Sequence, residues 1–595
     1  MPRAFATRVD EFLAEFFRLL PVHATSAGHH EHDHRWPDLT DAGRAERIAF
    51  LDAWDQAFRA MGDDSLTAGE RLDRDLLLQE IDALRFDEVD LATERWDPLE
   101  WVYLLGGGLF PLLAREFAPL PVRLASATGR IEGIPGLVQA AKGQLTGLED
   151  RPVSRLHAET ALKQLPGIIE LVDDAVTAAA DGPADEAIDA LRPRLQQAAA
   201  TARAAIGELE THLREVVLPR SDGEGRLGAE LFAGKLLRTL RNADLTPARV
   251  LERAERDYSV VRAELVRLAR DQWSTWRPDQ PVPAVETAGS ADAADDAIVR
   301  GVLDAIAAEH QRAPDLLDFC RRELQRVEAF CRDGDLIGLA EDPLEIRWTP
   351  VYLRAFGGAM LDSPGPLDRG QKAFFSITPI PDDWTPEQAE SYLREDNDRM
   401  LRLLTIHEAV PGHYLQGVYA NRHPSIVRSI FWSGVFAEGW AVYVTQVMMD
   451  EGYGADDPAL LLTHWKFYLR AITNAIIDIR IHTLGMSEDE AVRLMVDGGF
   501  QEEAEARNKY SRARLTATQL STYYVGSLEF WDLEHETRRR AAVTSGDPRA
   551  ADAVALPRLV GGYGQTPGFV YRHHLEACIS QGSPPMPLLR RILLG

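Results

Sequence analysis

Residues 407–413, with the sequence His-Glu-Ala-Val-Pro-Gly-His, contain the side chains that a hydrolytic zinc site needs. Two neutral imidazoles bind zinc and a neighbouring carboxylate takes a proton from water, an arrangement that the spacing His-Glu-x-x-His gives on a regular helix. Here the second histidine follows six positions after the first, about 120° around an ideal helix. Pro411 opens the hydrogen-bond ladder, so a turn widened by two residues would return His413 to the face of His407. We expect both histidines to bind zinc, with Glu408 as general base.

Glu438 is the candidate for the third protein ligand that a catalytic zinc usually has. It lies 31 residues after His407, in an otherwise apolar segment over residues 430–449. An ionised carboxylate in such a segment needs a partner. We expect the metal to be that partner, and a buried ion pair with Arg or Lys is the alternative.

Two later segments carry further polar side chains. Asp478 and His482 are four residues apart and share a helix face. They could orient a metal-binding imidazole or contact substrate, and an ordinary Asp–His pair is the alternative. Residues 519–526 contain Tyr523 and Tyr524. A phenol that reaches the metal can stabilise an oxyanion, although spacing alone favours core packing.

A second histidine-rich tract lies at residues 29–34, with the sequence His-His-Glu-His-Asp-His. Its composition would allow a metal site. We expect a solvated loop instead, because the tract lies in a loop-like region. His535-Glu536 repeats the His-Glu pair but has no histidine at a useful distance after it.

Helical periodicity dominates the chain, and the fold class we expect is mostly α. Thr385, Pro386 and Gln388 form a strong helix start, which predicts a long helix over about 386–410 that carries the first histidine. Apolar residues also recur at helical spacing in several other segments. These are residues 42–62, 195–216, 246–272, 296–332 and 456–484.

Two segments are predicted to be non-helical. Residues 276–295, rich in Pro, Ala and Asp, indicate a linker or long loop. Within 342–384, the aromatic and β-branched run 373–378 indicates a short strand, which is either an exposed edge that a peptide could extend or a buried core strand. We expect an N-terminal helical region (1–275), the linker (276–295) and a catalytic helical region (296–595), packed as one body around a substrate cleft.

Composition excludes several classes of function. The 595 residues are 45% hydrophobic and carry a net charge of −28, which disfavours binding to nucleic acid or to an anionic membrane. Three cysteines without a CxxC pair provide neither a disulfide framework nor a thiolate zinc site. The first 25 residues have the pattern of a helix and not of a signal peptide, and no transmembrane stretch is apparent, so we expect a cytoplasmic protein.

These motifs resemble the bacterial family named domain of unknown function 885 (DUF885), whose members have a His-Glu-x-x-Pro-Gly-His helix followed by Glu-Gly-Trp-Ala. One departure is Thr-Ala-Thr-Gln at 516–519, where the family usually has Pro-Gly-Gln. The family in turn is similar to helical zinc peptidases of the gluzincin type, which bind zinc through two histidines and a downstream glutamate. The matching segments, which span nearly the whole chain, are 20–28, 407–413, 438–441, 478–482, 519–526 and 581–584.

The residues and the resemblance together predict a zinc-dependent peptidase that cleaves oligopeptides. Zinc would lower the pKa of a water molecule towards about 7 and polarise the scissile carbonyl. Glu408 would move the proton to the leaving amine. Tyr523, and as a second candidate His482, would stabilise the oxyanion. Asp478 would not bind the metal but would contact the residues that do. A zinc hydrolase of another amide, or a non-catalytic zinc or peptide-binding protein, is the alternative.

Overall fold

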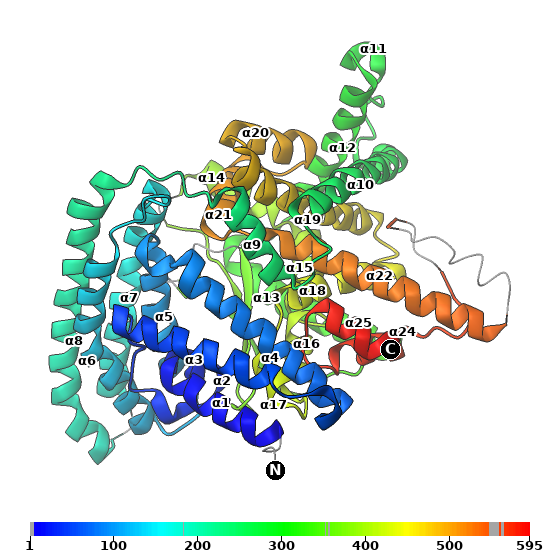
Figure 1. Ribbon diagram of the computed structural model, residues 1–595. Coiled ribbons are helices and arrows are strands. Elements are labelled where there is room, and N and C mark those ends of the chain that lie inside the picture. The colour runs from blue at the N-terminus through cyan, green and yellow to red at the C-terminus, as the bar shows by residue number, and fades with distance from the viewer. Residues whose placement is uncertain are drawn as a thin grey trace.

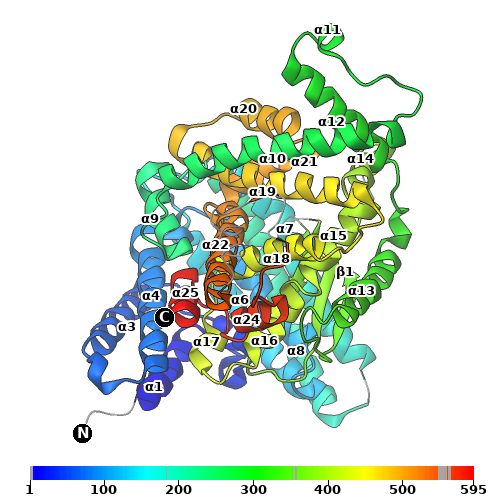
Figure 2. The same ribbon diagram turned by 90° about the vertical axis from the view of Figure 1, so that its right-hand side faces the viewer.

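The computed structural model describes residues 5–182, 184–350, 353–354, 358–382, 384–546, 559–560 and 564–595. Most of these residues are helical, as the periodicity predicts, and strands occur in one small sheet. Of the periodic segments, 296–332 forms two helices rather than one, separated by residues 308–315. Figures 1 and 2 show the arrangement from two sides.

The N-terminal part consists of two groups of helices, drawn in blue and in cyan (Figure 1). Aromatic residues of the first group pack with Val427 and Phe431 from the C-terminal half, so this group is joined to the rest by a shared apolar core. The first group is α1 (Phe5–Leu19), α2 (Pro21–Ala27), α3 (Asp41–Arg59) and α4 (Ala68–Phe86). The second is α5 (Pro98–Ala114), α6 (Leu120–Gln144), α7 (Arg155–Asp181) and α8 (Glu186–His212), which share a core of their own.

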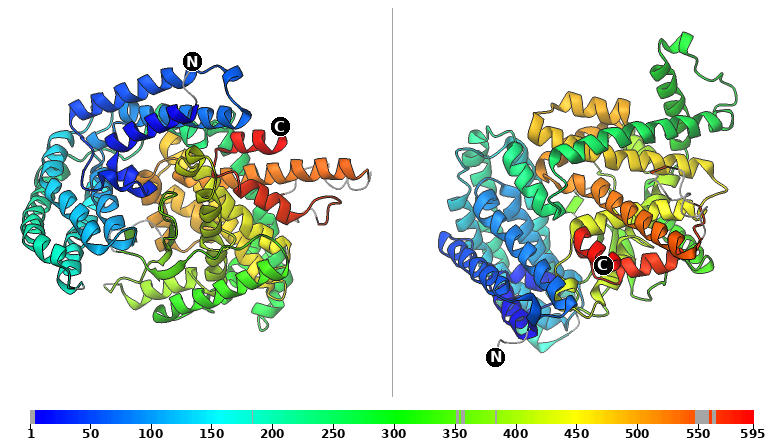
Figure 3. Two further views of the ribbon diagram at one scale, coloured as in Figure 1. Left: turned by 90° about the horizontal axis from the view of Figure 1, so that it is seen from below. Right: turned by 45° about the vertical axis from the view of Figure 1, so that its right-hand side comes forward.

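The largest core joins the middle of the chain to its C-terminal half. Its middle helices are α9 (Gly228–Leu240), α10 (Pro247–Trp276), α12 (Ala291–Ala307) and α13 (Leu316–Asp333). From the C-terminal half the core takes residues of α15 (Asp398–Glu408), α16 (His413–Asn421), α18 (Gly434–Asp450), α19 (Pro458–Leu484), α22 (Gln519–Ser545), α24 (Tyr571–Ile579) and α25 (Met586–Leu594). The other described helices of this half are α14 (Pro386–Glu395), α17 (Ile426–Ile430), α20 (Glu488–Arg493) and α21 (Glu503–Leu515). In both views of Figure 3 the cyan helices of the N-terminal part lie to the left of the red helices α24 and α25. Because α9 and α10 belong to this core, part of the region predicted over 1–275 packs into the C-terminal half, and the division into three regions stays a prediction.

The small sheet contains β1 (Leu344–Trp348), β2 (Ala359–Asp362) and β3 (Ala373–Ile377) in the order β1-β3-β2. β3 runs parallel to β1, with Ile346 opposite Phe375, and antiparallel to β2, with Leu361 opposite Phe375. All five residues of β3 are buried. The strand predicted at 373–378 is therefore confirmed as a core strand, and its alternative role as an exposed edge is wrong because β1 and β2 cover both sides.

The helix predicted over 386–410 is two helices. Its start is confirmed, because Thr385 and Gln388 form a reciprocal capping box at the N-terminus of α14. The chain breaks at Asp396, and the Asn397 side chain accepts hydrogen bonds from the backbone N–H groups of Arg399 (3.1 Å) and Met400 (3.3 Å) to begin α15. The apolar periodicity continues across Asn397, so the pattern alone does not indicate that a helix ends and a new one begins there.

The segment predicted as a linker, 276–295, contains the last residue of α10, the short helix α11 (Val285–Ala288) and the start of α12. α11 projects from the top of the molecule in Figures 1 and 2. Among the described helices, none combines the length and the apolar character needed to span a membrane.

Candidate metal centre

The two histidines of the motif lie on different helices. His407 is near the end of α15 and His413 begins α16. Between them the chain turns through a cis Val410–Pro411 peptide, and the Gly412 N–H donates to the Ile406 oxygen at 3.0 Å. A Cβ atom at Gly412 would overlap the backbone oxygen of His407, so glycine is required there. The predicted widened turn is thus replaced by a helix break, which brings His413 back beside His407.

The structure brings together the three side chains predicted to bind zinc. Oε2 of Glu438 lies 3.3 Å from Nε2 of His413 and 3.9 Å from Nε2 of His407. The three ligand atoms lie within 4.8 Å of one another, and the described part of the chain holds no other such group of histidine, cysteine or acidic residues. A tetrahedral zinc with bonds of about 2.1 Å separates its ligand atoms by about 3.4 Å. Two nitrogens and one carboxylate oxygen at this separation fit zinc without rearrangement of the backbone.

Close packing of α18 on α22 places Glu438. The two helices meet at Gly439 and Gly526, where a Cβ atom on either residue would overlap the backbone of the other helix. The Trp440 indole N–H also donates to the Pro411 oxygen at 2.8 Å, which fixes α18 to the helix break. Within the described residues no Lys or Arg nitrogen pairs with Glu438, so the alternative of a buried ion pair with a basic residue is not found.

Burial and mutual charge set the protonation of the site. Burial raises the pKa of Glu408 to about 7, and its Oε2 has no hydrogen-bond partner among the described residues. Burial, together with the charge of His413, lowers the pKa of His407 to about 3. Burial opposes the charge on His413 and Glu438, but their hydrogen bond outweighs it, raising the pKa of the histidine and lowering that of the glutamate. The centre thus contains a neutral imidazole, His407, and a carboxyl group, Glu408, whose pKa is close to neutral pH.

Tyr523 lies at the same cavity, near Glu438. Its phenol oxygen accepts hydrogen bonds from Arg512 (3.0 Å) and Gln519 (2.9 Å). We did not predict a role for Arg512, because an arginine on a polar helix carries no spacing signal. Tyr524 faces away and donates to Asp257 on α10 at 2.8 Å.

Asp478 and His482 do not contact the three ligands. Both are buried on α19, where Asp478 accepts from the backbone N–H groups of Thr518 and Ser521, each at 3.1 Å, and so caps α22. His482 faces the Leu227 N–H (3.1 Å) and the Ala513 oxygen (2.9 Å), so both ring nitrogens are bonded to backbone. It does not line the cavity. We therefore leave His482 out of the catalytic set, and Asp478 supports the helix of Tyr523 instead of orienting an imidazole.

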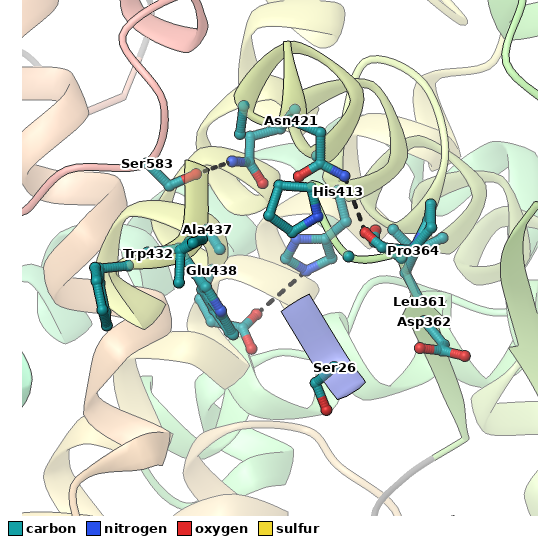
Figure 4. Close-up of a pocket in the computed structure, with 18 of the residues that line it drawn as sticks. Ser26, Leu361, Asp362, Pro364, His413, Asn421, Trp432, Ala437, Glu438 and Ser583 are labelled. Carbon is teal, nitrogen blue, oxygen red and sulfur yellow. Dashed lines mark hydrogen bonds and ion pairs between the residues drawn. The ribbon is translucent and has the colours of Figure 1, made fainter. Parts of the chain in front are cut away.

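A cavity of about 710 Å³ opens on the three ligands. One wall comes from β2, α15, α16, α18 and α22, and the opposite wall from residues of α1, α2 and α4, such as Phe16, Ser26 and Glu80. Figure 4 shows Glu438 and His413 pointing toward each other, with Asp362, Trp432 and Ser26 around them. The N-terminal helices therefore form part of the site, which the sequence did not predict.

The histidine-rich tract 29–34 is a short 3₁₀ turn, η1 (His30–His32), with flanking residues. The His30 ring bridges Asp33 (Nδ1 to Oδ2, 2.8 Å) and Asp368 (Nε2 to Oδ1, 2.9 Å) and stacks on Phe117 with ring centroids 3.6 Å apart. This bridge joins the N-terminal helices to the loop after β2. The tract is neither a freely solvated loop nor part of the metal-ligand group.

The chain belongs to the bacterial family of proteins of unknown function DUF885, whose model matches residues 21–593. It is similar to a solved structure from Shewanella oneidensis described as a "putative lipoprotein of unknown function", with 30% identity, a TM-score of 0.78, and 99% of this chain and 100% of that chain covered. A "putative lipoprotein" from Colwellia psychrerythraea shares the fold at 14% identity, with a TM-score of 0.76 and coverages of 99% and 97%. No curated protein matches.

Proposed function

We propose that this protein is a zinc-dependent peptidase of the gluzincin type that cleaves oligopeptides. One observation carries the proposal: two imidazole nitrogens and a carboxylate oxygen converge in a cavity, beside a second carboxylate, Glu408, whose Oε2 has no hydrogen-bond partner among the described residues. A structural zinc site needs no such base, and it is usually closed by four ligands. A buried carboxylate oxygen without a hydrogen-bond partner lowers the stability of the fold, so its presence here points to a function.

His407, His413 and Glu438 would hold the metal, which when bound supplies a lowered pKa for water and polarisation of the carbonyl. Glu408 would take the proton of the attacking water on Oε2 and pass it to the leaving amine. A carboxyl group with a pKa of about 7 suits both steps. Tyr523 would donate a hydrogen bond to the oxyanion.

The cavity supports a peptide as the substrate class. Among the described strands β2 pairs only with β3, and its residues Ala359–Asp362 line the cavity next to the proposed ligands. An extended peptide can add to such an edge through main-chain hydrogen bonds. The cavity has a volume of about 710 Å³ and is lined in part by N-terminal helices, a size that suits a short peptide better than a folded protein, which is why we propose oligopeptides.

A zinc hydrolase acting on another amide would use the same ligands and base, and the edge of β2 is the observation that favours peptides over it. A non-catalytic zinc or peptide-binding protein is disfavoured by Glu408. The net charge of −28 gives no basis for a nucleic-acid partner. A cytoplasmic location stays a prediction, and the two similar solved structures are each described as a "putative lipoprotein".

The test begins with metal analysis of the purified protein, followed by mass spectrometry of a mixed peptide library incubated with and without chelator. We expect about one zinc per chain, cleavage that stops with chelator and returns with added zinc, and products confined to short peptides. Bound zinc without cleavage of any peptide would contradict the peptidase and favour another amide or a non-catalytic role.

A further inference from the structure

We propose that Arg512 and Gln519 are positioning residues, which fix the Tyr523 phenol as a hydrogen-bond donor toward the cavity and hold Glu438 so that one oxygen faces the metal. The inference rests on the proposed function. Its evidence is the direction of four hydrogen bonds among these side chains, which connect α21, α22 and α18.

The direction is set by Arg512, because a guanidinium donates hydrogen bonds and accepts none. Its Nη2 donates to Oε1 of Gln519 at 3.1 Å and to the phenol oxygen of Tyr523 at 3.0 Å. The carboxamide oxygen of Gln519 must therefore face Arg512. Its amide nitrogen is left to face the opposite way, toward the metal centre.

The amide nitrogen of Gln519 then donates twice. It reaches the phenol oxygen of Tyr523 at 2.9 Å and Oε1 of Glu438 at 3.4 Å. The other oxygen of Glu438, Oε2, is the one that lies near both histidines. Gln519 thus divides the carboxylate into an anchored oxygen and a metal-facing oxygen, as outer partners of metal ligands commonly do.

The phenol oxygen of Tyr523 accepts two hydrogen bonds, which fills its two acceptor positions. Its own proton finds no acceptor among the described residues, although the ring lines the cavity beside the metal ligands. The proton is therefore available to an oxygen of the substrate. An oxyanion stabiliser needs this preorganisation, because a hydroxyl that must first reorient stabilises the transition state less.

The surrounding helices hold the arrangement in place. Gln519 and Tyr523 are one turn apart on α22, whose start is fixed by Asp478. Arg512 comes from α21, and its Nε is buried without a hydrogen-bond partner among the described residues. Such a buried donor lowers stability, so the arginine is not placed there for stability alone.

The competing role for Arg512 is to bind the terminal carboxylate of a peptide substrate. The two roles differ in kinetics: a positioning residue acts on kcat through Tyr523, whereas a substrate ligand acts on KM and only for peptides with a free carboxyl terminus. A double-mutant cycle separates them, because a residue that acts through Tyr523 has nothing to act on once the hydroxyl is removed.

The experiment compares Arg512→Met, Tyr523→Phe and the double variant on one good substrate and on its C-terminal amide. We expect Tyr523→Phe to lower kcat about ten- to a thousand-fold and Arg512→Met to lower it about ten- to a hundred-fold, with KM within about three-fold on both substrates. In the Tyr523→Phe background, Arg512→Met should change kcat by less than about two-fold. Arg507→Met, an exposed arginine of the same helix, is the matched control.

A second readout does not need turnover. Affinity for a phosphinic analogue of the substrate, which presents a tetrahedral anionic oxygen, should fall in Arg512→Met and in Tyr523→Phe, and zinc content should stay at the wild-type level. Losses that multiply in the double variant, or a loss confined to the free-acid substrate, would overturn the inference while leaving the peptidase intact. A wild-type protein without turnover on any peptide would contradict the proposed function instead.

Discussion

Two clusters in this chain combine histidines with carboxylates, one around His30 and one around His413, yet they differ in how their hydrogen-bonding atoms are used. Both ring nitrogens of His30 are taken by Asp33 and Asp368. At the candidate metal centre, the imidazoles of His407 and His413 point together at one oxygen of Glu438 inside a cavity. The His30 cluster is therefore saturated, because both ring nitrogens are bonded. In the His413 cluster, the ring nitrogens converge on one oxygen.

Electrostatics follows the same division. Burial disfavours charge on His30, but its two carboxylate partners outweigh burial and raise the pKa to about 9, which makes the ring a cation locked in ion pairs. His407 is held neutral, as a metal ligand must be. Residue types alone therefore do not identify a metal site. Convergence of ligand atoms on one point in a cavity is a stronger criterion, because that is what a metal ion requires.

The largest effect that tests this comparison is on metal content. His413→Ala removes one of three ligands, so we expect bound zinc to fall to near zero under conditions where the wild type is loaded. His30→Ala is the matched control, and it should keep its zinc while losing stability. Metal analysis after dialysis measures both. Wild-type zinc in His413→Ala, or loss of zinc in His30→Ala, would reverse the assignment of the two clusters.

The next effect is on turnover. Glu408→Gln keeps the size of the side chain but removes the proton acceptor, so we expect kcat to fall about a hundred- to ten-thousand-fold while zinc content and melting temperature change little. Steady-state kinetics, with metal analysis and a thermal melt on the same sample, checks this. Cleavage at the wild-type rate by Glu408→Gln would place the base elsewhere.

A smaller effect distinguishes the two neighbouring tyrosines. Tyr523 lines the cavity, and Tyr524 donates to Asp257 in the core. Tyr523→Phe should lower kcat with little loss of stability. Tyr524→Phe should keep kcat near wild type and lower the free energy of unfolding by about 1–3 kcal/mol, because it removes the hydrogen bond that Tyr524 donates to the buried carboxylate of Asp257. Kinetics and denaturant unfolding of both variants test the pair. The opposite pattern would mean that Tyr524 faces the substrate.

Local signals carried much of the sequence analysis. The class of fold, the capping box at Thr385 and the strand at 373–377 follow from periodicity, caps and β-branched composition, which act within a few residues. The ligand set was predicted because its residues are chemically unusual in apolar segments. The helix break at Asp396 was missed, and the break at Pro411 was predicted only as a widened turn, since neither is resolved by spacing alone.

The rest depends on contacts between distant segments. Asp478 caps a helix that begins 41 residues later, at Gln519, and His482 is satisfied by two backbone groups, one of them from α21. The wall of the cavity contributed by α1, α2 and α4 likewise arises from packing of the N-terminal helices against the C-terminal half. Spacing within one segment cannot predict such contacts, because they are set by the arrangement of whole helices.

The smallest effect concerns pH and the saturated cluster. The pKa of His30 rises from 6.5 in the unfolded chain to about 9 in the fold, so its ion pairs contribute fully below pH 6.5 and are lost as pH rises through about 9. The full shift would correspond to about 3 kcal/mol, but the side chain is 26% exposed, so we expect about 1–2 kcal/mol. Denaturant unfolding of the wild type and of His30→Asn at several pH values should show a stability difference that shrinks from pH 6.5 to 9.5. His573→Asn, at an exposed histidine of α24, should show no such trend, and a constant difference for His30→Asn would mean that its ring is neutral and that the bridge to Asp368 is an ordinary hydrogen bond.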